Sequence, residues 1–479
     1  MMKANSIFPR SLPESQGIAA EAIARCLQDM ERRGLELHSF MLVRHGHVIS
    51  EGWWAPYAPE RPHMLFSLSK SFTSTAIGLL VQEGRISVQD RVVSFFPEDA
   101  PAEISSHLAS MTIRDLLVMG TGHAEDTSAK MQQSDNYVRN LLELPVEHEP
   151  GTHFAYNSGA TYLLSAILQK VTGMTLLEYL QPRLLEPLGI EGATWGSCPR
   201  GITMGGWGMK ITTEDIAKFG QLYLQKGQWQ GMQIVPSSWI EEATSKQIEN
   251  GVEADNDWQQ GYGYQFWRCQ HGAYRGDGAF GQYCIVMPEQ DAVIAITSGV
   301  NDTGAILKVI WEQLLPAMKS EELPPDREAA ESLGHQLRGL HLDPPKAHAA
   351  SLLENDISGI QYELADNDSK LRTSFFQFTE EYVILTLDYE DSKHTVIFGR
   401  NQWHSGMCSI GMKAEEPALG SATWQDTNTL ELTLRYVETP FCITMVCTFD
   451  QGGVELLVRP NVSFGGEEPS VIVGKALTR

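Results

Sequence analysis

The sequence predicts an α+β fold in two parts: an antiparallel sheet flanked by helices with an inserted helical lobe, then an all-β barrel or sandwich domain. Three observations predict it. Strand-like runs stand near both ends of 1–320 with a long helical region between them, a stretch rich in Pro, Glu, Ala and His fills 321–352, and short alternating segments fill 353–479. Alternation of apolar and polar residues is typical of half-buried strands. We therefore expect a domain at 1–320, a linker at 321–352 and a small antiparallel β domain at 353–479.

The first part opens with a helix and a hairpin. Apolar residues at helical spacing predict a helix over 20–33. The β-rich runs 39–44 and 48–52 flank the turn at 45–47 and are typical of a hairpin. Two histidines of this turn lack further ligands in the sequence, so we expect a surface turn and no metal site there.

A long, mostly helical region then extends from about 67 to 244. Strand character returns at 282–287 and 291–298, before a predicted helix over 304–315. Strands at both ends with helices between them indicate one sheet that is built from the two ends of the region, with the helices inserted as a lobe.

The last part contains about eight short segments with alternating or apolar character. These are 360–364, 371–378, 382–389, 395–398, 430–437, 441–449, 454–458 and 471–473. This number of strands at this spacing predicts a small antiparallel barrel or sandwich.

Composition excludes several classes of partner. The formal net charge of -24 repels phosphate backbones and anionic membranes, so we expect no nucleic-acid and no membrane partner. The seven cysteines are scattered, odd in number and without a Cys-x-x-Cys pair, which is typical of free thiols in a reducing compartment. Residues 1–10 lack the apolar core of a signal peptide, and no later run has the length of a membrane span. We therefore expect a cytoplasmic protein.

Ser67 and Lys70 form the most informative pair in the chain. They are three residues apart at the start of a predicted helix, and they form the only Ser-x-x-Lys in the sequence. Helical positions three residues apart lie on one face. A serine hydroxyl is a poor nucleophile until a base takes its proton, and a lysine whose ammonium is disfavoured by burial can be that base. The pair therefore predicts nucleophilic catalysis.

Five stretches in chain order support this hypothesis. They are 66–73, 112–117, 150–158, 186–190 and 278–282. Together they resemble the serine β-lactamase-like hydrolases of the class C type, a family that includes penicillin-binding proteins, esterases and amidases. The resemblance covers roughly 18–315, and several matches in order are far more specific than one motif.

The resemblance implies a role for each site residue. Ser67 would be the nucleophile, with Lys70 as its base and Tyr156, as a tyrosinate or a neutral phenol, relaying the proton to the leaving group. The backbone N–H groups of Ser67 and Ala279 would form the oxyanion hole. No metal and no organic cofactor is implied.

Two motifs depart from the family pattern. The family's Tyr-x-Asn is Tyr-Asn-Ser here, and the hydroxyl of Ser158 offers fewer hydrogen bonds than an amide. The family's Lys-Thr-Gly or His-x-Gly aligns with 276–278, where the cationic residue is missing and Asp277 stands beside the gap. Arg275 is a candidate source of that charge, although adjacent strand residues face opposite sides. Gly278 would let the substrate approach, so we expect Ser158, Asp277 and Gly278 to bind substrate.

These departures favour an esterase or a small-amide hydrolase that works through an acyl-enzyme over a β-lactamase. Two alternatives stay open: a non-catalytic ligand-binding protein of the penicillin-binding type, and a D-amino-acid peptidase in which Asp277 meets a substrate ammonium. The expected partner is a small ester or amide, and a homodimer stays open. Five aromatic residues are candidate walls of an apolar pocket: Trp53, Trp54, Tyr57, Trp207 and Trp267.

Overall fold

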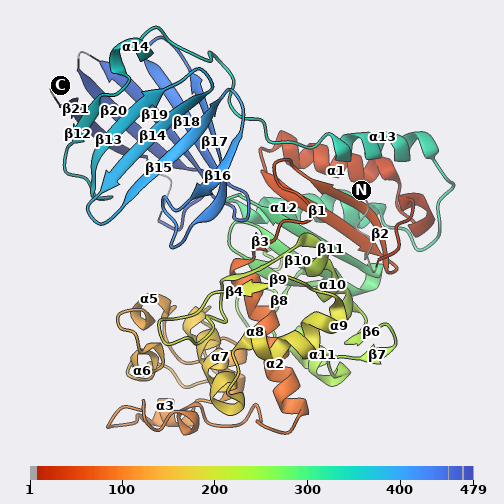
Figure 1. Ribbon diagram of the computed structural model, residues 1–479. Helices are drawn as coiled ribbons and strands as arrows, with labels where there is room; N and C mark the ends of the chain where they lie inside the picture. The colour runs from red at the N-terminus through yellow and green to blue at the C-terminus, as the bar shows by residue number, and fades with distance from the viewer. Residues whose placement is uncertain (1–7, 451, 466–468, 478–479) are drawn as a thin grey trace. The chain divides into compact units, whose positions relative to one another are not determined.

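The computed structural model describes residues 8–450, 452–465 and 469–477, and it divides into two compact units. The first unit runs from the N-terminal part of the chain to Trp53 and then takes Ala58–Ser298 and Asp302–Leu340, whereas the second takes Trp54–Tyr57, Gly299–Asn301 and the chain from His341 onward (Figure 1). Most of the N-terminal segment used to judge the absence of a signal peptide lies outside the described residues. Among the described helices, none is both long and apolar enough to cross a bilayer.

A six-stranded antiparallel sheet forms the centre of the first unit, in the order β2-β1-β11-β10-β9-β8. The strands are β1 (Leu37–Arg44), β2 (His47–Trp53), β8 (Trp267–Arg268), β9 (Tyr274–Gly278), β10 (Gln282–Met287) and β11 (Ala292–Ser298). Strand β1 pairs with β11 so that Phe40 lies opposite Ile296. The prediction that both ends of the region build one sheet is therefore confirmed. Both of these central strands are buried along their whole length because helices cover the sheet.

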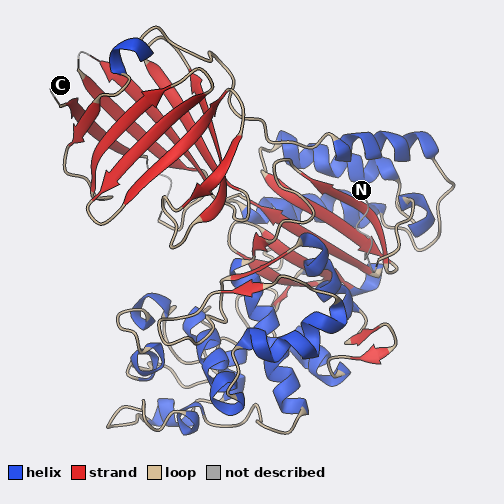
Figure 2. Ribbon diagram, viewed as in Figure 1, coloured by secondary structure: helices blue, strands red, loops and turns tan. Residues whose placement is uncertain are grey.

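Helices contact the sheet from several parts of the chain. Helix α10 (Thr213–Leu224) packs on β1, β10 and β11, and α13 (Arg327–Arg338) packs on β2 and on α1 (Ala20–Arg32) (Figures 1 and 2). Helix α12 (Thr303–Val309) continues into a π turn, η7 (Ile310–Leu314), so the helix predicted over 304–315 is divided in two. Short 3-10 turns connect the remaining parts: η1 (Pro13–Gln16), η5 (Gln270–Gly272), η6 (Pro288–Gln290) and η8 (Leu315–Ala317).

The inserted lobe is helical, as predicted. Its elements are α2 (Ser69–Gln82), η3 (Val92–Phe95), α3 (Ser106–Ser110), α4 (Ile113–Leu117), α5 (Ser128–Met131), α6 (Tyr137–Leu142), α7 (Ser158–Thr172), α8 (Leu176–Leu180), η4 (Gln181–Leu185), α9 (Glu186–Leu188) and α11 (Ser237–Thr244). Threonine begins three helices of this unit through a capping box, at Thr112, Thr175 and Thr212. In each box the hydroxyl accepts from a backbone N–H three residues on, while the acidic side chain at that position bonds the cap.

Two small sheets complete the first unit. Strands β3 (His63–Met64), β5 (Met209–Ile211) and β4 (Thr194–Trp195) form one, and the hairpin of β6 (Gln228–Trp229) and β7 (Met232–Gln233) forms the other. The small sheet matters for the site because β3 leads directly into the turn that carries Ser67.

The second unit is a barrel. Its strands are β12 (Gln361–Leu364), β13 (Leu371–Phe378), β14 (Tyr382–Tyr389), β15 (Lys393–Arg400), β16 (His404–Cys408), β17 (Glu416–Trp424), β18 (Thr429–Tyr436), β19 (Cys442–Asp450), β20 (Gly453–Pro460) and β21 (Ser470–Ala476), with one short helix, α14 (Glu354–Ile357). Neighbours pair in the order β15-β14-β13-β12-β21-β20-β19-β18-β17-β16. A short parallel contact between β15 and β17 closes the ring, and β16 pairs with β17 beside this closure. The all-β prediction is confirmed, in its barrel form.

The prediction of about eight strands omitted β16 and β17. The β17 sequence contains Pro417 and Gly420, which are typical strand breakers. Gly420 is nevertheless required at the closure, because a Cβ there would lie 2.5 Å from the carbonyl oxygen of Ile397. The glycine that hides this strand in the sequence therefore allows the barrel to close.

The stretch 321–352 is not uniform. It contains α13, which belongs to the first unit, and the second unit begins its long segment at His341.

Candidate active site

Ser67 lies in a single 3-10 turn, η2 (Phe66–Leu68), directly before α2. The N–H of Leu65 donates to the carbonyl oxygen of Met209 over 2.9 Å and so ties the turn to β5. Phe66 has a φ of 49°, a left-handed conformation that costs a non-glycine residue about 1–3 kcal/mol. The fold therefore holds the residue before Ser67 in a strained backbone, which sets the direction of the serine.

Lys70 is 1% exposed and contacts three oxygens. Its Nζ lies 2.9 Å from Ser67 Oγ, 3.1 Å from Ser158 Oγ and 2.9 Å from the carbonyl oxygen of Gly206. No described carboxylate forms an ion pair with it. Burial lowers the pKa of Lys70 to about 7, although Asp126 and Asp277 act in the opposite direction. An amine with this pKa is partly neutral at neutral pH and can take the proton of a serine.

Tyr156 comes two residues before α7 and lies beside both groups. Lys70 Nζ is 4.8 Å from the centroid of its ring. The ring stacks on Trp267 with centroids 5.2 Å apart. Burial raises the pKa of Tyr156 far above its ordinary value, and the nearby Ser67 hydroxyl has a smaller effect in the opposite direction. The group is therefore a neutral phenol at neutral pH, which can donate a proton but does not start as a tyrosinate.

Ser158, predicted to bind substrate, is buried with its hydroxyl against Lys70. Its backbone N–H donates to Asp126 Oδ1 over 2.9 Å. The preceding Asn157 turns away, accepts from the Gly159 N–H at the start of α7 and bonds Thr127. The structure thus places Ser158 among the groups that hold the amine.

Strand β9 lies directly against the serine turn. A Cβ on Gly278 would be 2.0 Å from the carbonyl oxygen of Leu65, and a Cβ on Gly276 would be 2.2 Å from Leu68 Cδ1. A side chain at position 278 would push the strand away from the turn, whereas one at position 276 would displace the side chains of Leu68 and Ser71. Glycine at both positions therefore allows the close packing of β9 on the serine turn.

Arg275 and Asp277 lie on the same face of β9 and pair with each other. Arg275 Nε donates to Asp277 Oδ2 over 2.8 Å, and the guanidinium, which is 0% exposed, lies 4.6 Å above the ring of Trp258. Burial raises the pKa of Asp277, while Arg275 and then Lys70 act to lower it. The positive charge of Arg275 is thus neutralised by Asp277.

Ala279 lies in the turn after β9, and Phe280 beside it has a φ of 65°. The ring of Phe280 meets that of Phe66 edge to face, with centroids 5.4 Å apart. This contact joins the two turns that carry Ser67 and Ala279. Their assignment as the oxyanion hole stays a prediction.

Sequence reasoning missed three features of this site: the Gly206 carbonyl, Asp126 and the Arg275–Asp277 pair. A backbone carbonyl has no sequence signal, and Asp126 is one of many acidic residues in the chain. The alternation of Arg275 and Asp277 on a strand was a usable signal, because residues i and i+2 share a face. Trp267 stacks on Tyr156, and the carbonyl of Trp207 accepts from Trp195 Nε1, so their role as walls of an apolar pocket stays a prediction.

Comparison with known proteins gives matches over this unit and over the whole chain. The 6-aminohexanoate-dimer hydrolase of Paenarthrobacter ureafaciens is 27% identical over 313 residues, which are 60% of this chain and 80% of that protein. The octameric penicillin-binding protein homologue from Pyrococcus abyssi has a TM-score of 0.52 at 17% identity and covers 95% of this chain and 99% of its own. EstCE1, a hydrolase with promiscuous acyltransferase activity, has a TM-score of 0.51 at 17% identity, and the match covers 62% of this chain and 99% of EstCE1. The two structural likenesses concern the fold alone.

The family predicted from the motifs is confirmed by a model of that family. The Beta-lactamase model matches residues 21–315, which is more than half of the chain and includes every residue of the site described above. This chain belongs to the Beta-lactamase family.

Proposed function

We propose that this protein is a serine hydrolase that cleaves small linear amides or esters through an acyl-enzyme at Ser67. One observation carries the proposal: a buried amine with a pKa of about 7 lies 2.9 Å from the Ser67 hydroxyl. Burying a lysine without a carboxylate partner lowers the stability of a fold. Groups with such strongly shifted pKa values cluster at functional sites.

The geometry supports an order of proton movements. Neutral Lys70 takes the proton of Ser67 as Oγ bonds the substrate carbonyl carbon, and backbone N–H groups stabilise the oxyanion. The phenol of Tyr156 gives its proton to the leaving amine or alkoxide as that bond breaks, and the Lys70 ammonium restores the phenol. Water then attacks the acyl carbon and gives a proton to the Lys70 amine. The Lys70 ammonium returns this proton to Ser67 Oγ as the bond between Oγ and the acyl carbon breaks, so the carboxylic acid and the free Ser67 hydroxyl are released.

Charge around the site favours a substrate without a carboxylate at the position that meets β9. The third motif offers Asp277 there, and the Arg275 cation is already paired with it. Asp126 is exposed, and it acts on both Lys70 and Tyr156. We therefore expect amides and esters that carry an ammonium group and no carboxylate on the side that meets β9 to react faster than β-lactams, which carry a carboxylate.

The test combines labelling and turnover. The wild type, Ser67→Ala and Ser74→Ala are treated with a fluorophosphonate, analysed by intact-protein mass spectrometry, and assayed on p-nitrophenyl esters, 6-aminohexanoate dimer and a penicillin. Ser74 is a matched control, since it is a buried serine of α2, the helix that follows the Ser67 turn, and its Oγ bonds no described residue. We expect an adduct in the wild type and in Ser74→Ala only, and a loss of kcat of about a thousandfold or more in Ser67→Ala. Turnover by Ser67→Ala at the wild-type rate would contradict the mechanism, and labelling without any turnover would favour the ligand-binding alternative.

A further inference from the structure

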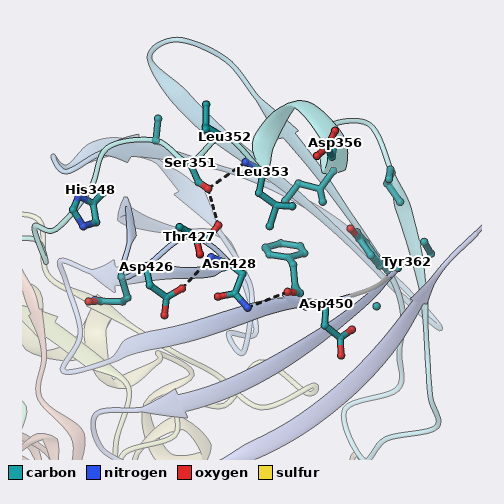
Figure 3. A pocket seen from close by; sticks show the side chains of 18 residues that line it. His348, Ser351, Leu352, Leu353, Asp356, Tyr362, Asp426, Thr427, Asn428 and Asp450 are labelled. Atoms are coloured by element: carbon teal, nitrogen blue, oxygen red, sulfur yellow. Dashed lines mark hydrogen bonds between the residues drawn. The ribbon is translucent and has the colours of Figure 1, made fainter.

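The barrel has a cavity of about 1010 Å³ at one end (Figure 3). The turn between β17 and β18, the end of β19 and the segment with α14 surround it. These parts meet at the same end because successive antiparallel strands alternate in direction. All lining residues belong to the second unit, which does not contain Ser67.

The cavity has an apolar floor. Phe449, Tyr362 and Ile357 form part of it and are 3%, 2% and 7% exposed, while Leu353 and Ile360 add aliphatic surface beside them. Deeper in the barrel, side chains such as Trp424 and Phe376 are 0% exposed and belong to one apolar core. The packed core of the barrel therefore forms the base of the cavity, and the size of the cavity suits a small organic ligand.

Three carboxylates stand around this floor on three different segments: Asp356, Asp426 and Asp450 (Figure 3). None of them forms an ion pair with a described basic residue, and the lining contains no lysine or arginine. Backbone N–H groups of Asn428 and Thr429 bond Asp426 Oδ1 and hold the pKa of this carboxyl below its ordinary value. The rim is thus negatively charged at neutral pH, and its charge is not neutralised within the described structure.

An apolar floor below carboxylates that have no ion-pair partner favours one kind of ligand. An anion is repelled by the rim, and a fully hydrated cation gains nothing from the floor. We propose that this cavity binds a small organic ammonium ion with an apolar body, with the alkyl or aryl part on Phe449 and Tyr362 and the ammonium among Asp356, Asp426 and Asp450. This ligand site is separate from the hydrolase chemistry assigned to Ser67.

The test is calorimetric titration of the full chain with octyltrimethylammonium and, for comparison, with octanoate, which has a chain of the same length and the opposite charge. The chain is titrated with and without a fluorophosphonate label at Ser67, and Ser67→Ala is titrated beside it, so that any binding at the acidic hydrolase site is recognised as a second site that the label removes. We expect saturable binding of the cation at one site per chain, and at least about tenfold weaker binding of octanoate.

Variants locate the site. The double variant Asp356→Asn/Asp450→Asn should weaken binding of the cation by about tenfold and should not weaken binding of octanoate. It removes two negative charges and keeps the shapes of both side chains. Ile360→Ala should weaken both ligands because it removes part of the floor. Asp368→Asn is the control, as an exposed carboxylate of the same unit outside the cavity. A thermal melt of each variant checks that the barrel is folded, and ester turnover should stay at the wild-type value.

Three results would overturn the proposal: no saturable binding of the cation in the millimolar range, equal affinity for the two ligands, or an unchanged affinity in the folded Asp356→Asn/Asp450→Asn variant. None of these depends on whether Ser67 is a nucleophile, so failure of this inference and failure of the proposed function are distinguishable.

Discussion

The charged residues that we assign to the two sites lie in different surroundings, buried in the first unit and exposed in the barrel. The first unit buries Lys70 and Arg275 almost completely, next to Asp277 and at the meeting point of β9 and the serine turn. The barrel fills its interior with aromatic and aliphatic side chains and leaves Asp356, Asp426 and Asp450 exposed at one end. Burial without a full set of partners shifts the pKa of a charged group, whereas an exposed charge contributes an electrostatic field to its surroundings.

This difference separates chemistry from binding. Taking Lys70 out of water makes its amine a base near neutral pH. Keeping the barrel carboxylates in water leaves them able to attract a cation.

Replacement of the buried amine should have the largest effect on activity. Lys70→Met should lower kcat by about 10²–10⁴-fold, as expected for loss of a general base. In the wild type, kcat/KM should rise with pH to a plateau with a midpoint near 7, because the reaction needs the neutral amine and the pKa of Lys70 is about 7. The variant should lose this rise. Ester turnover measured from pH 5 to 9 checks both, and a wild-type profile without a midpoint in this range would contradict the assignment.

Breaking the Arg275–Asp277 pair should have the largest effect on stability. Arg275→Met leaves the Asp277 carboxylate without its 2.8 Å partner, and loss of one member of a buried pair costs about 3–5 kcal/mol of the free energy of unfolding. Asp277→Asn in the same chain should recover part of this loss, since it removes the uncompensated charge. Urea unfolding of the single and double variants checks it, and a double variant less stable than Arg275→Met would count against the pair as the cause.

The barrel offers a smaller, matched change. Trp424 is 0% exposed, and its Nε1 donates to Glu354 Oε1 over 2.6 Å. The guanidinium of Arg400 donates to both oxygens of the same carboxylate. Trp424→Phe should destabilise the barrel by about 1–3 kcal/mol through loss of one donor to a partly buried carboxylate. Ester turnover should be unchanged at temperatures where both proteins are folded. A loss of turnover in the folded variant would mean that the two units do not divide their roles as described.

The pH dependence of stability should show an effect of up to about 2 kcal/mol between pH 7 and pH 9. The pKa of Lys70 is about 7 in the folded chain, below its ordinary 10.5, so between these values the unfolded chain holds a proton that the folded chain has lost. Stability from this group therefore rises with pH across that window. The Tm of the wild type should gain on that of Lys70→Met between pH 7 and pH 9, and a constant difference would show that the amine is not neutral in the folded state.

Much of this organisation could be predicted from the sequence. Helix α1, the hairpin of β1 and β2, strands β10 and β11 and most strands of the barrel follow from apolar periodicity, which is a local property. The order of the five motifs identified the family, and with it Ser67, Lys70 and Tyr156 as candidates. The spacing of the first two also predicted their contact, because a helical turn brings positions three apart together.

Long-range contacts decided the rest. Strand β17 was hidden because its Gly420 looks like a break until β15 lies against it. Arg275 seemed free to meet a substrate until the pleat of β9 placed it beside Asp277. The pKa of Lys70 depends on burial and on three oxygens, two of which come from Ser158 and Gly206, 88 and 136 residues away in the chain.

The sequence by itself determined the two-part architecture, the family and the residues that can carry the chemistry, since composition, periodicity and ordered motifs are properties of short stretches of chain. Only the tertiary structure decided the protonation of Lys70 and Tyr156, the pairing of Arg275 with Asp277 and the acidic cavity of the barrel. The physical reason is that desolvation and charge pairing depend on which surfaces come together in space, and distance along the chain does not record this.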